Sequence, residues 1–308
     1  MKSYVCGGVF PGCSANWICP TGPEFHVAVR SEGGSVHRRV PVEEPSADTE
    51  GGVEWQGLLE RAIEGEGIRF LYQPIVDLGR FEIAGYEALA RFDLGPRFGP
   101  GAWFAAAKRW GVAADLEATT LRHALSIRDD LPQGVFMTVN IEPESLSSSR
   151  VLDVFAELGS LKGIAVEITA HRPVDDPSAV ASAFENFRAA GALISMDQPG
   201  CGYAVLPQLL EIRPDILKLD RALTEDIDSD DAKASLVQLA AAFASQIDAK
   251  LLAGIETIEE GRKCAALGIA LAQGFIMGHP AEPWPVLNPE LRRQIRPSVF
   301  KRMVTSSR

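Results

Sequence analysis

From about residue 54 to about residue 285, short apolar runs alternate with stretches whose apolar residues recur every three or four positions. The short runs are typical of buried strands, and the periodic stretches are typical of amphipathic helices. Strands are predicted at 68–76, 81–91, 135–141, 164–168, 193–196, 216–219, 251–255 and 274–277. Helices are predicted at 103–110, 116–128, 151–158, 178–190, 232–247 and 258–267. This alternation predicts an α/β fold of the TIM-like (β/α)8 barrel type, although an open doubly wound sheet gives much the same pattern.

The first two predicted strands depart from a regular barrel. Only Asp77-Leu78-Gly79-Arg80 separates them, and a four-residue link cannot contain a crossover helix. These strands are therefore predicted to form an antiparallel hairpin.

The chain is divided by composition into four segments. Residues 31–53 are rich in Gly, Pro, Ser and charge, which is typical of a flexible linker. We therefore expect a short Cys-containing N-terminal arm at 1–30, a linker at 31–53, one barrel domain at 54–285, and a basic tail at 286–308.

The N-terminal arm carries four groups that can bind zinc, namely Cys6, Cys13, Cys19 and His26. Four such ligands would suit a tetrahedral site, but no Cys-x2-Cys pair is present. The spacing fits no zinc motif well, so reduced thiols in a short arm are the simpler interpretation.

The overall composition is that of a globular protein, with 46% hydrophobic and 23% charged residues. The formal net charge of −11 argues against binding to polymeric DNA or RNA, which requires a basic face. The longest mostly apolar segment, 234–247, is too short to span a bilayer, so no transmembrane segment is expected. The N-terminus lacks a secretory pattern, and a cytoplasmic location is expected.

In a parallel barrel, the functional side chains lie at the carboxyl ends of the strands. Those ends supply carboxylates, an amide and a lysine, a set that suits a hard divalent cation bound through oxygen. Polar strand ends are also common in barrels of this size without any metal. The side chains are Glu87, Arg91, Asn140, Glu167, Asp197, Lys218 and Glu256, with Gln273 near the start of the last predicted strand.

These residues lie in sequence blocks that resemble the EAL-domain family of bacterial cyclic di-GMP phosphodiesterases. The signature blocks are Tyr72-Gln73-Pro74-Ile75-Val76-Asp77 and Gly85-Tyr86-Glu87-Ala88-Leu89-Ala90-Arg91. Further blocks follow in order, at 139–141, 166–169, 213–220, 254–257 and 272–275. The resemblance covers about residues 54–285 and implies the EAL fold, a TIM-like barrel.

The resemblance also implies roles for individual residues. Glu87, Asn140, Glu167 and Asp197 match the positions that hold the first metal, Mg2+ or Mn2+. Gln73 and Arg91 match positions that contact the dinucleotide. Lys218 matches the lysine near the attacking water, and Glu256 and Gln273 match residues that support the metal-bound water. Active family members cut cyclic di-GMP to linear pGpG with two cations, and family members commonly form homodimers.

Three positions depart from the family pattern. Ala170 replaces an acid that steadies the following loop, Gln198 replaces the aspartate of the second metal site, and Ala253 replaces the general-base glutamate. A neutral amide binds a divalent cation less well than a carboxylate does. Loss of general-base help typically lowers a rate by about 10²–10⁴-fold.

This pattern predicts a degenerate EAL domain, and three interpretations remain open. The first is a cyclic di-GMP receptor or regulator with little or no hydrolysis and an unknown protein partner. The second is a weak metal-dependent phosphodiesterase that produces pGpG. The third is a protein-interaction module that binds no dinucleotide.

Overall fold

The computed structural model describes residues 28–31, 34–37, 49–50, 53–95, 98–169, 177–198, 206–288 and 291. The chain divides into two units, residues 1–55 and 56–308. The candidate zinc ligands, Ala170 and the basic tail after residue 291 lie outside the described residues.

The first unit contains two short antiparallel strand pairs. Strand β1 (Ala28–Ser31) pairs with β2 (Gly34–His37), and β3 (Thr49–Glu50) pairs with β4 (Val53–Glu54). Part of the segment predicted to be a linker therefore has strand pairing.

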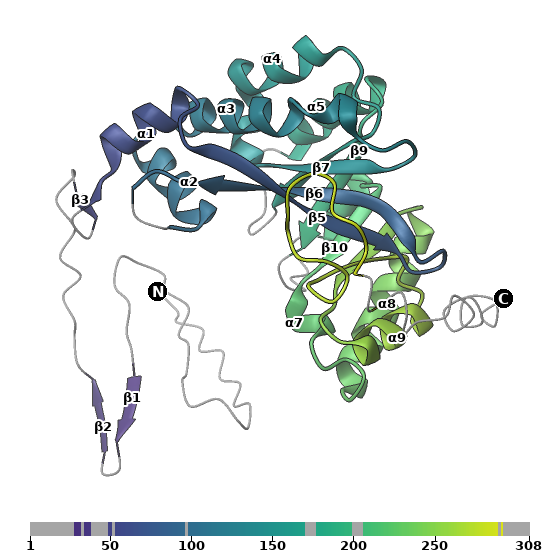
Figure 1. Cartoon of the computed structure of the whole chain (residues 1–308). Helices are drawn as coiled ribbons and strands as arrows, with labels where there is room; N and C mark the ends of the chain where they lie inside the picture. Colours follow the sequence, from purple (N-terminus) through teal and green to yellow (C-terminus); the bar gives the residue numbers. More distant parts are fainter. Residues whose placement is uncertain are drawn as a thin grey trace. The chain divides into compact units, whose positions relative to one another are not determined.

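The second unit is built around a closed barrel whose strands follow one another in the order β10-β11-β12-β5-β6-β7-β8-β9. Figure 1 shows the barrel strands with α3, α4 and α5 gathered on one side and α7, α8 and α9 on another. The strands are β5 (Ile68–Asp77), β6 (Glu82–Phe92), β7 (Phe136–Ile141), β8 (Ile164–Thr169), β9 (Leu193–Gln198), β10 (Ile216–Leu219), β11 (Lys250–Gly254) and β12 (Leu271–Gln273). The predicted barrel is confirmed.

The predicted hairpin is also confirmed. Strand β5 pairs antiparallel with β6 on one side and with β12 on the other, whereas the remaining neighbours are parallel. Strand β5 is therefore the one inverted strand of this barrel.

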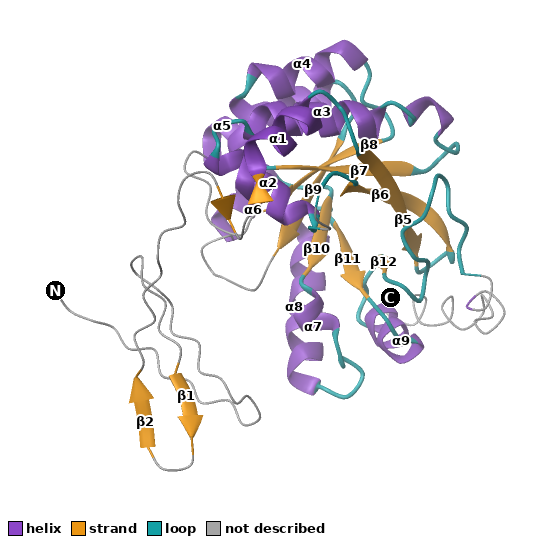
Figure 2. Cartoon of the chain, turned by 60° about the vertical axis from the view of Figure 1, so that its left-hand side comes forward, coloured by secondary structure: helices purple, strands orange, loops and turns teal. Residues whose placement is uncertain are grey.

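Helices surround the barrel, as Figure 2 shows. The elements that match predicted helices are α2 (Pro100–Arg109), α3 (Ala113–Leu125), α4 (Ser149–Leu158), α5 (Pro177–Ala189), α8 (Asp231–Gln246) and α9 (Ile258–Ala266). The pattern did not predict α1 (Trp55–Ile63), α6 (Leu206–Ile212), α7 (Arg221–Thr224) or the 3-10 turns η1 (Arg128–Asp130) and η2 (Pro143–Ser147). In the described ranges, no helix is both long and apolar enough to cross a membrane.

One strand prediction is wrong. The last strand is β12 at 271–273, and residues 274–277 form a turn. A Cβ at Gly274 would overlap the carbonyl oxygen of Ile255, so the backbone at this position packs directly against the neighbouring loop and leaves the sheet. Gln273 consequently ends its strand instead of preceding it.

Alternation along the strands separates two hydrophobic clusters. The smaller cluster comprises Ile75, Ile216, Leu252 and Leu271, from four successive neighbours around the barrel. The larger cluster contains most of the remaining buried residues of the strands and helices. Leu252 of the small cluster also lines a cleft whose other lining residues are mostly polar, and this cleft is the candidate site.

Candidate functional site

A cleft of about 420 Å3 opens where β9, β10, β11 and β12 end. Its walls come from the ends of these strands, the segments that follow them, and the middle of β5 and β6. Six of the predicted site residues line it, namely Gln73, Glu87, Asp197, Lys218, Glu256 and Gln273. Strand register explains this convergence, because Gln73 lies opposite Glu87, Lys218 beside Asp197, and Gln273 beside Gly254.

Lys218 bridges two buried carboxylates at the bottom of the site. Its Nζ lies 3.0 Å from Glu87 Oε1 and 3.1 Å from Glu167 Oε1. The side chains of Glu87 and Glu167 are only 8% and 1% exposed, so each charge requires a partner. The ammonium therefore neutralises part of the acidic cluster from inside the barrel.

The pKa values of these groups follow from burial and from this pairing. Burial alone would lower the pKa of Lys218, but the nearby carboxylates of Glu167, Glu87 and Asp197 raise it, so the ammonium keeps its proton. Burial opposes ionisation of Glu87, yet Lys218 and hydrogen bonds from Gln273 and Asn140 lower its pKa. Burial raises the pKa of Glu167 to about 7.

Gln273 joins the two antiparallel strands to this centre. Its Nε2 donates to Gln73 Oε1 at 2.9 Å and to Glu87 Oε2 at 2.5 Å. Among the described residues, none donates to Gln273 Oε1, although the atom is buried. A buried acceptor without a donor is energetically costly, because it has lost its hydrogen bonds to water.

The donor chemistry of the site fits a hard divalent cation in part. Glu87, Asn140, Glu167 and Asp197 come from the consecutive strands β6 to β9 and offer only oxygen ligands to a cation. Asn140 lies beside Glu167 in register and donates to Glu87 Oε1 at 3.3 Å. Within the described ranges, however, no group of three or more His, Cys, Asp or Glu side chains is arranged to hold a metal. The ammonium of Lys218 instead occupies the space between two of the carboxylates.

Arg91 and Asn140 line a second cavity of about 200 Å3, and neither lines the cleft. This cavity lies between β6, β7 and the helices α2 and α3, and it contains the buried Glu117. Glu117 Oε1 accepts from the backbone N–H of Glu142 at 2.6 Å, which fixes the chain just after Asn140. Burial raises the pKa of Glu117 to about 7.

Two of the positions where the resemblance implies acids, 253 and 198, have different surroundings in the structure. Ala253 is fully buried in the larger hydrophobic cluster, with Cys264 and Ala265 of α9, and does not line the cleft. Its neighbours Leu252 and Gly254 line the cleft instead. Gln198 ends β9 beside Leu219, and its side chain lies outside the described residues.

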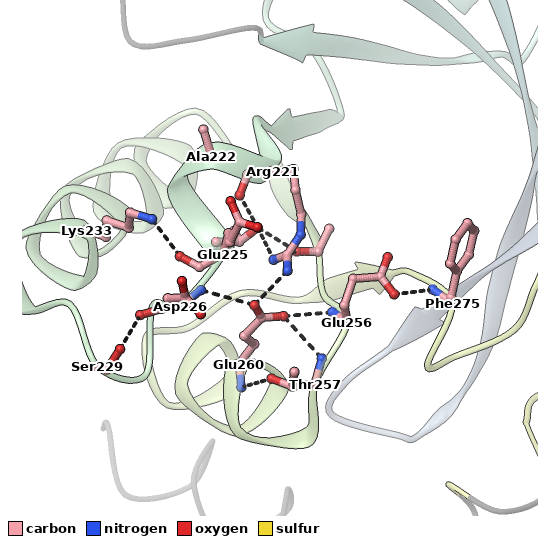
Figure 3. Close-up of polar contacts among 12 residues, drawn as sticks. Arg221, Ala222, Glu225, Asp226, Ser229, Lys233, Glu256, Thr257, Glu260 and Phe275 are labelled. Carbon is pink, nitrogen blue, oxygen red and sulfur yellow. Dashed lines mark hydrogen bonds and ion pairs between the residues drawn. The ribbon is translucent and has the colours of Figure 1, made fainter. Parts of the chain in front are cut away.

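The sequence reasoning missed a polar network beside the cleft (Figure 3). Glu260, on α9, is 2% exposed and accepts from Arg221 Nη2 at 2.7 Å and from the backbone N–H of Glu256 at 2.7 Å. It also forms a capping box with Thr257, a reciprocal pair at the start of α9. The Thr-x-x-Glu spacing could have indicated this helix start.

Comparisons with known proteins agree with the geometry. A family profile described as "EAL domain" matches residues 57–280. The chain is 28% identical over 229 residues to a probable cyclic di-GMP phosphodiesterase, PdeB, of Escherichia coli K12, covering 71% of this chain and 43% of PdeB. The chain therefore spans less than half the length of this curated relative.

Two solved structures share the fold. The FimX EAL domain of Xanthomonas citri, in complex with cyclic di-GMP, superposes with a TM-score of 0.66 at 20% identity, covering 76% of this chain and 94% of that one. A calcium and cyclic di-GMP complex of BlrP1 from Klebsiella pneumoniae gives a TM-score of 0.62 at 24% identity, covering 70% and 56%.

Proposed function

Because the chain belongs to the EAL-domain family, we propose that it binds cyclic di-GMP in the cleft as a receptor or regulator and hydrolyses it little or not at all. The observation that carries this proposal is the Lys218 bridge between Glu87 and Glu167. An ammonium held between the two carboxylates supplies the positive charge that a resident cation would otherwise supply.

The same site keeps the groups that a cyclic dinucleotide needs. Lys218 places a positive charge on the wall of the cleft, where phosphate oxygens can accept from it. Gln73 and Gln273 line the same cleft and are joined by a hydrogen bond, so their amides are held in place beside the ligand. Binding is therefore supported by side chains that need no cation.

Hydrolysis lacks such support. Strand β11 itself contributes only Leu252 and Gly254 to the cleft wall, so the strand carries no acid that can accept the proton of an attacking water. Glu256, the acid that follows β11 in the cleft, already has one oxygen bonded to the Phe275 N–H. The position of the second metal ligand carries Gln198, whose amide is neutral. Losing a base alone lowers a rate by about 10²–10⁴-fold.

A weak phosphodiesterase is the second candidate, favoured by the oxygen donors that the consecutive strands β6 to β9 carry, of which Asn140 and Glu167 lie side by side in register. A divalent cation, Mg2+ or Mn2+, would take its ligands from Glu87, Asn140, Glu167 and Asp197. When bound, it would polarise a phosphoryl oxygen as a Lewis acid. The chain's own contribution would be to orient the ligand through Gln73, Gln273 and Lys218.

One experiment separates these functions from a module that binds no dinucleotide. The full chain is incubated with labelled cyclic di-GMP, with and without Mg2+ or Mn2+, and both retained ligand and pGpG are measured. A receptor retains the ligand intact, and Glu87→Ala weakens this retention. Glu82→Ala is the control, since Glu82 is an exposed glutamate on the same strand. Turnover abolished by Glu87→Ala would instead establish the enzyme, and no retention at all would leave the interaction module.

Homodimer formation and an unknown protein partner stay predictions. Sedimentation of the full chain with and without cyclic di-GMP measures the first directly.

A further inference from the structure

Phe275 is the one aromatic residue among the described residues that line the cleft. It follows Gln273 by two positions, and 52% of its surface is exposed. Other phenylalanines around the barrel, such as Phe92, Phe155 and Phe184, are buried. An aromatic ring left in water at the wall of a polar cleft forgoes the burial that stabilises such side chains elsewhere.

The Phe275 ring has support on one side. The rings of Phe275 and His279 lie with their centroids 4.5 Å apart and their planes 30° from parallel. This pair forms an aromatic ledge at the edge of the cleft.

A continuous set of hydrogen bonds holds the backbone of this ledge in place (Figure 3). The N–H of Phe275 donates to Glu256 Oε2 at 3.0 Å. The N–H of Glu256 donates to Glu260 Oε2 at 2.7 Å, and Glu260 Oε1 accepts from Arg221 at 2.7 Å. Arg221 also donates to the carbonyl of Gly254, so the segments after β10, β11 and β12 are tied together.

We propose that Phe275 is a stacking platform for a purine base of the ligand, and that Glu256 is the positioning residue that holds it there. This inference rests on the proposed binding of a cyclic dinucleotide in the cleft. Each base of such a ligand offers a flat π face, and stacking on an exposed aromatic ring needs no particular hydrogen-bond pattern. Lys218 lines the same cleft as Phe275, so its ammonium is available to the phosphates of a ligand whose base stacks on the ring.

The role of Glu256 then differs from support of a metal-bound water. One of its oxygens is already occupied by the Phe275 N–H. Its own backbone is held by the buried Glu260, which is paired with Arg221. A ring fixed before the ligand arrives loses little freedom on binding, so this network raises affinity through pre-organisation.

The test is calorimetry of the full chain with cyclic di-GMP. Phe275→Ala is expected to weaken binding by about 5- to 150-fold, which is the range that removal of one base–aromatic stack produces. Phe275→Tyr keeps the ring and should bind almost as the wild type does, whereas Phe275→Leu keeps apolar bulk without a ring and should resemble Phe275→Ala. Leu239→Ala, on the exposed face of α8 and away from the cleft, is the control.

Cyclic di-AMP provides a second readout. Stacking does not distinguish purines, so Phe275→Ala should weaken both dinucleotides by the same factor and leave their affinity ratio unchanged. Equal affinities of the wild type, Phe275→Leu and Phe275→Ala would overturn the platform. Absence of binding by the wild type would instead overturn the proposed function, so the two failures are distinguishable.

The positioning role is tested by a double-mutant cycle. Glu256→Ala should weaken binding as Phe275→Ala does, and the double variant should be no weaker than either single one. Glu256→Gln keeps an oxygen acceptor for the Phe275 N–H and should rescue most of the loss. Additive losses, or a Glu256→Gln variant as weak as Glu256→Ala, would show that the carboxylate acts on the ligand and does not act through Phe275.

Discussion

Lys218 on β10 and Glu87 on β6 form a 3.0 Å ion pair across the barrel, between strands that lie four positions apart in the closed ring of eight. The pair is shielded from water, and Glu167 extends it on the other side of the ammonium. Breaking such a pair by removing one partner leaves an uncompensated charge in a poorly hydrated place.

Lys218→Ala is therefore expected to lower the free energy of unfolding by about 3–5 kcal/mol in urea denaturation at pH 8. The loss should be smaller at pH 6, because Lys218 lowers the pKa of Glu167, so its removal lets the buried carboxyl take up a proton more readily as the pH falls. Lys108→Ala is the control, since the Lys108–Glu144 pair is more than half exposed on both sides and should contribute about 0–1 kcal/mol.

Added Mg2+ gives a complementary measurement on the same variant. A cation that replaces the ammonium should raise the melting temperature of Lys218→Ala more than that of the wild type. An equal effect on both proteins would contradict competition between the ammonium and the cation.

The buried carboxyl of Glu117 is expected to make the free energy of unfolding depend on pH. Burial raises its pKa in the folded protein from 4.5 to about 7, so the folded state binds the proton more tightly than the unfolded state does. Its contribution is fully present below about pH 4.5 and is lost as the pH rises through 7. The shift corresponds to about 3 kcal/mol at most.

Glu117→Gln should remove this dependence, because the amide oxygen can still accept from Glu142 and carries no charge. The check is the free energy of unfolding from pH 5 to pH 8 for both proteins. Curves that stay parallel over this range would show that Glu117 does not titrate as predicted.

A side chain at position 274 is expected to clash with the backbone at the turn beside the cleft. A Cβ there would overlap the backbone oxygen of Ile255, which cannot rotate away as a side chain can. Gly274→Ala should destabilise the protein by about 1–3 kcal/mol or more and weaken ligand binding, because the turn carries Phe275. Thermal denaturation and calorimetry measure the two effects.

Gly101→Ala is the matched control for this prediction. Gly101 lies in α2, and a Cβ added there would meet no neighbouring atom within 4 Å. Alanine at a helical position should increase stability by up to about 1 kcal/mol. Equal destabilisation by both substitutions would contradict a specific contact at Gly274.

Restoring hydrolysis by substitution tests which position on β11 can carry a general base. The resemblance assigns the lost base to Ala253, whereas in the structure Leu252 lines the cleft and Ala253 does not. With Gln198→Asp added to each, Leu252→Glu should produce more pGpG from cyclic di-GMP than Ala253→Glu does. Both positions are buried among apolar side chains, so either carboxylate should destabilise the fold, but only position 252 lines the cleft.

If hydrolysis is restored in the double variant with Ala253→Glu and not in the one with Leu252→Glu, position 253 reaches the ligand. The measurement is the rate of pGpG formation with Mn2+, together with the melting temperature of each double variant.

The sequence by itself determined the alternation of strands and helices, the antiparallel first hairpin and most of the polar residues at the rim, whereas the choice of a closed barrel over an open sheet came from the resemblance to the EAL-domain family. It could do so because alternation of apolar runs and helical periods is local, and because a four-residue link excludes a crossover helix. The short helices α6 and α7 were missed, since four to seven residues give too little periodicity.

Only the tertiary structure decided which side chains meet. Side chains alternate faces along a strand, so a difference of one residue places Leu252 in the small apolar cluster that borders the cleft and Ala253 in the larger hydrophobic cluster, and no local pattern reveals that choice. The Lys218 bridge, the buried Glu260 and the exposed ring of Phe275 depend on contacts between strands and loops far apart in the chain. Barrel closure brings these residues together, and the chemistry of the site follows from it.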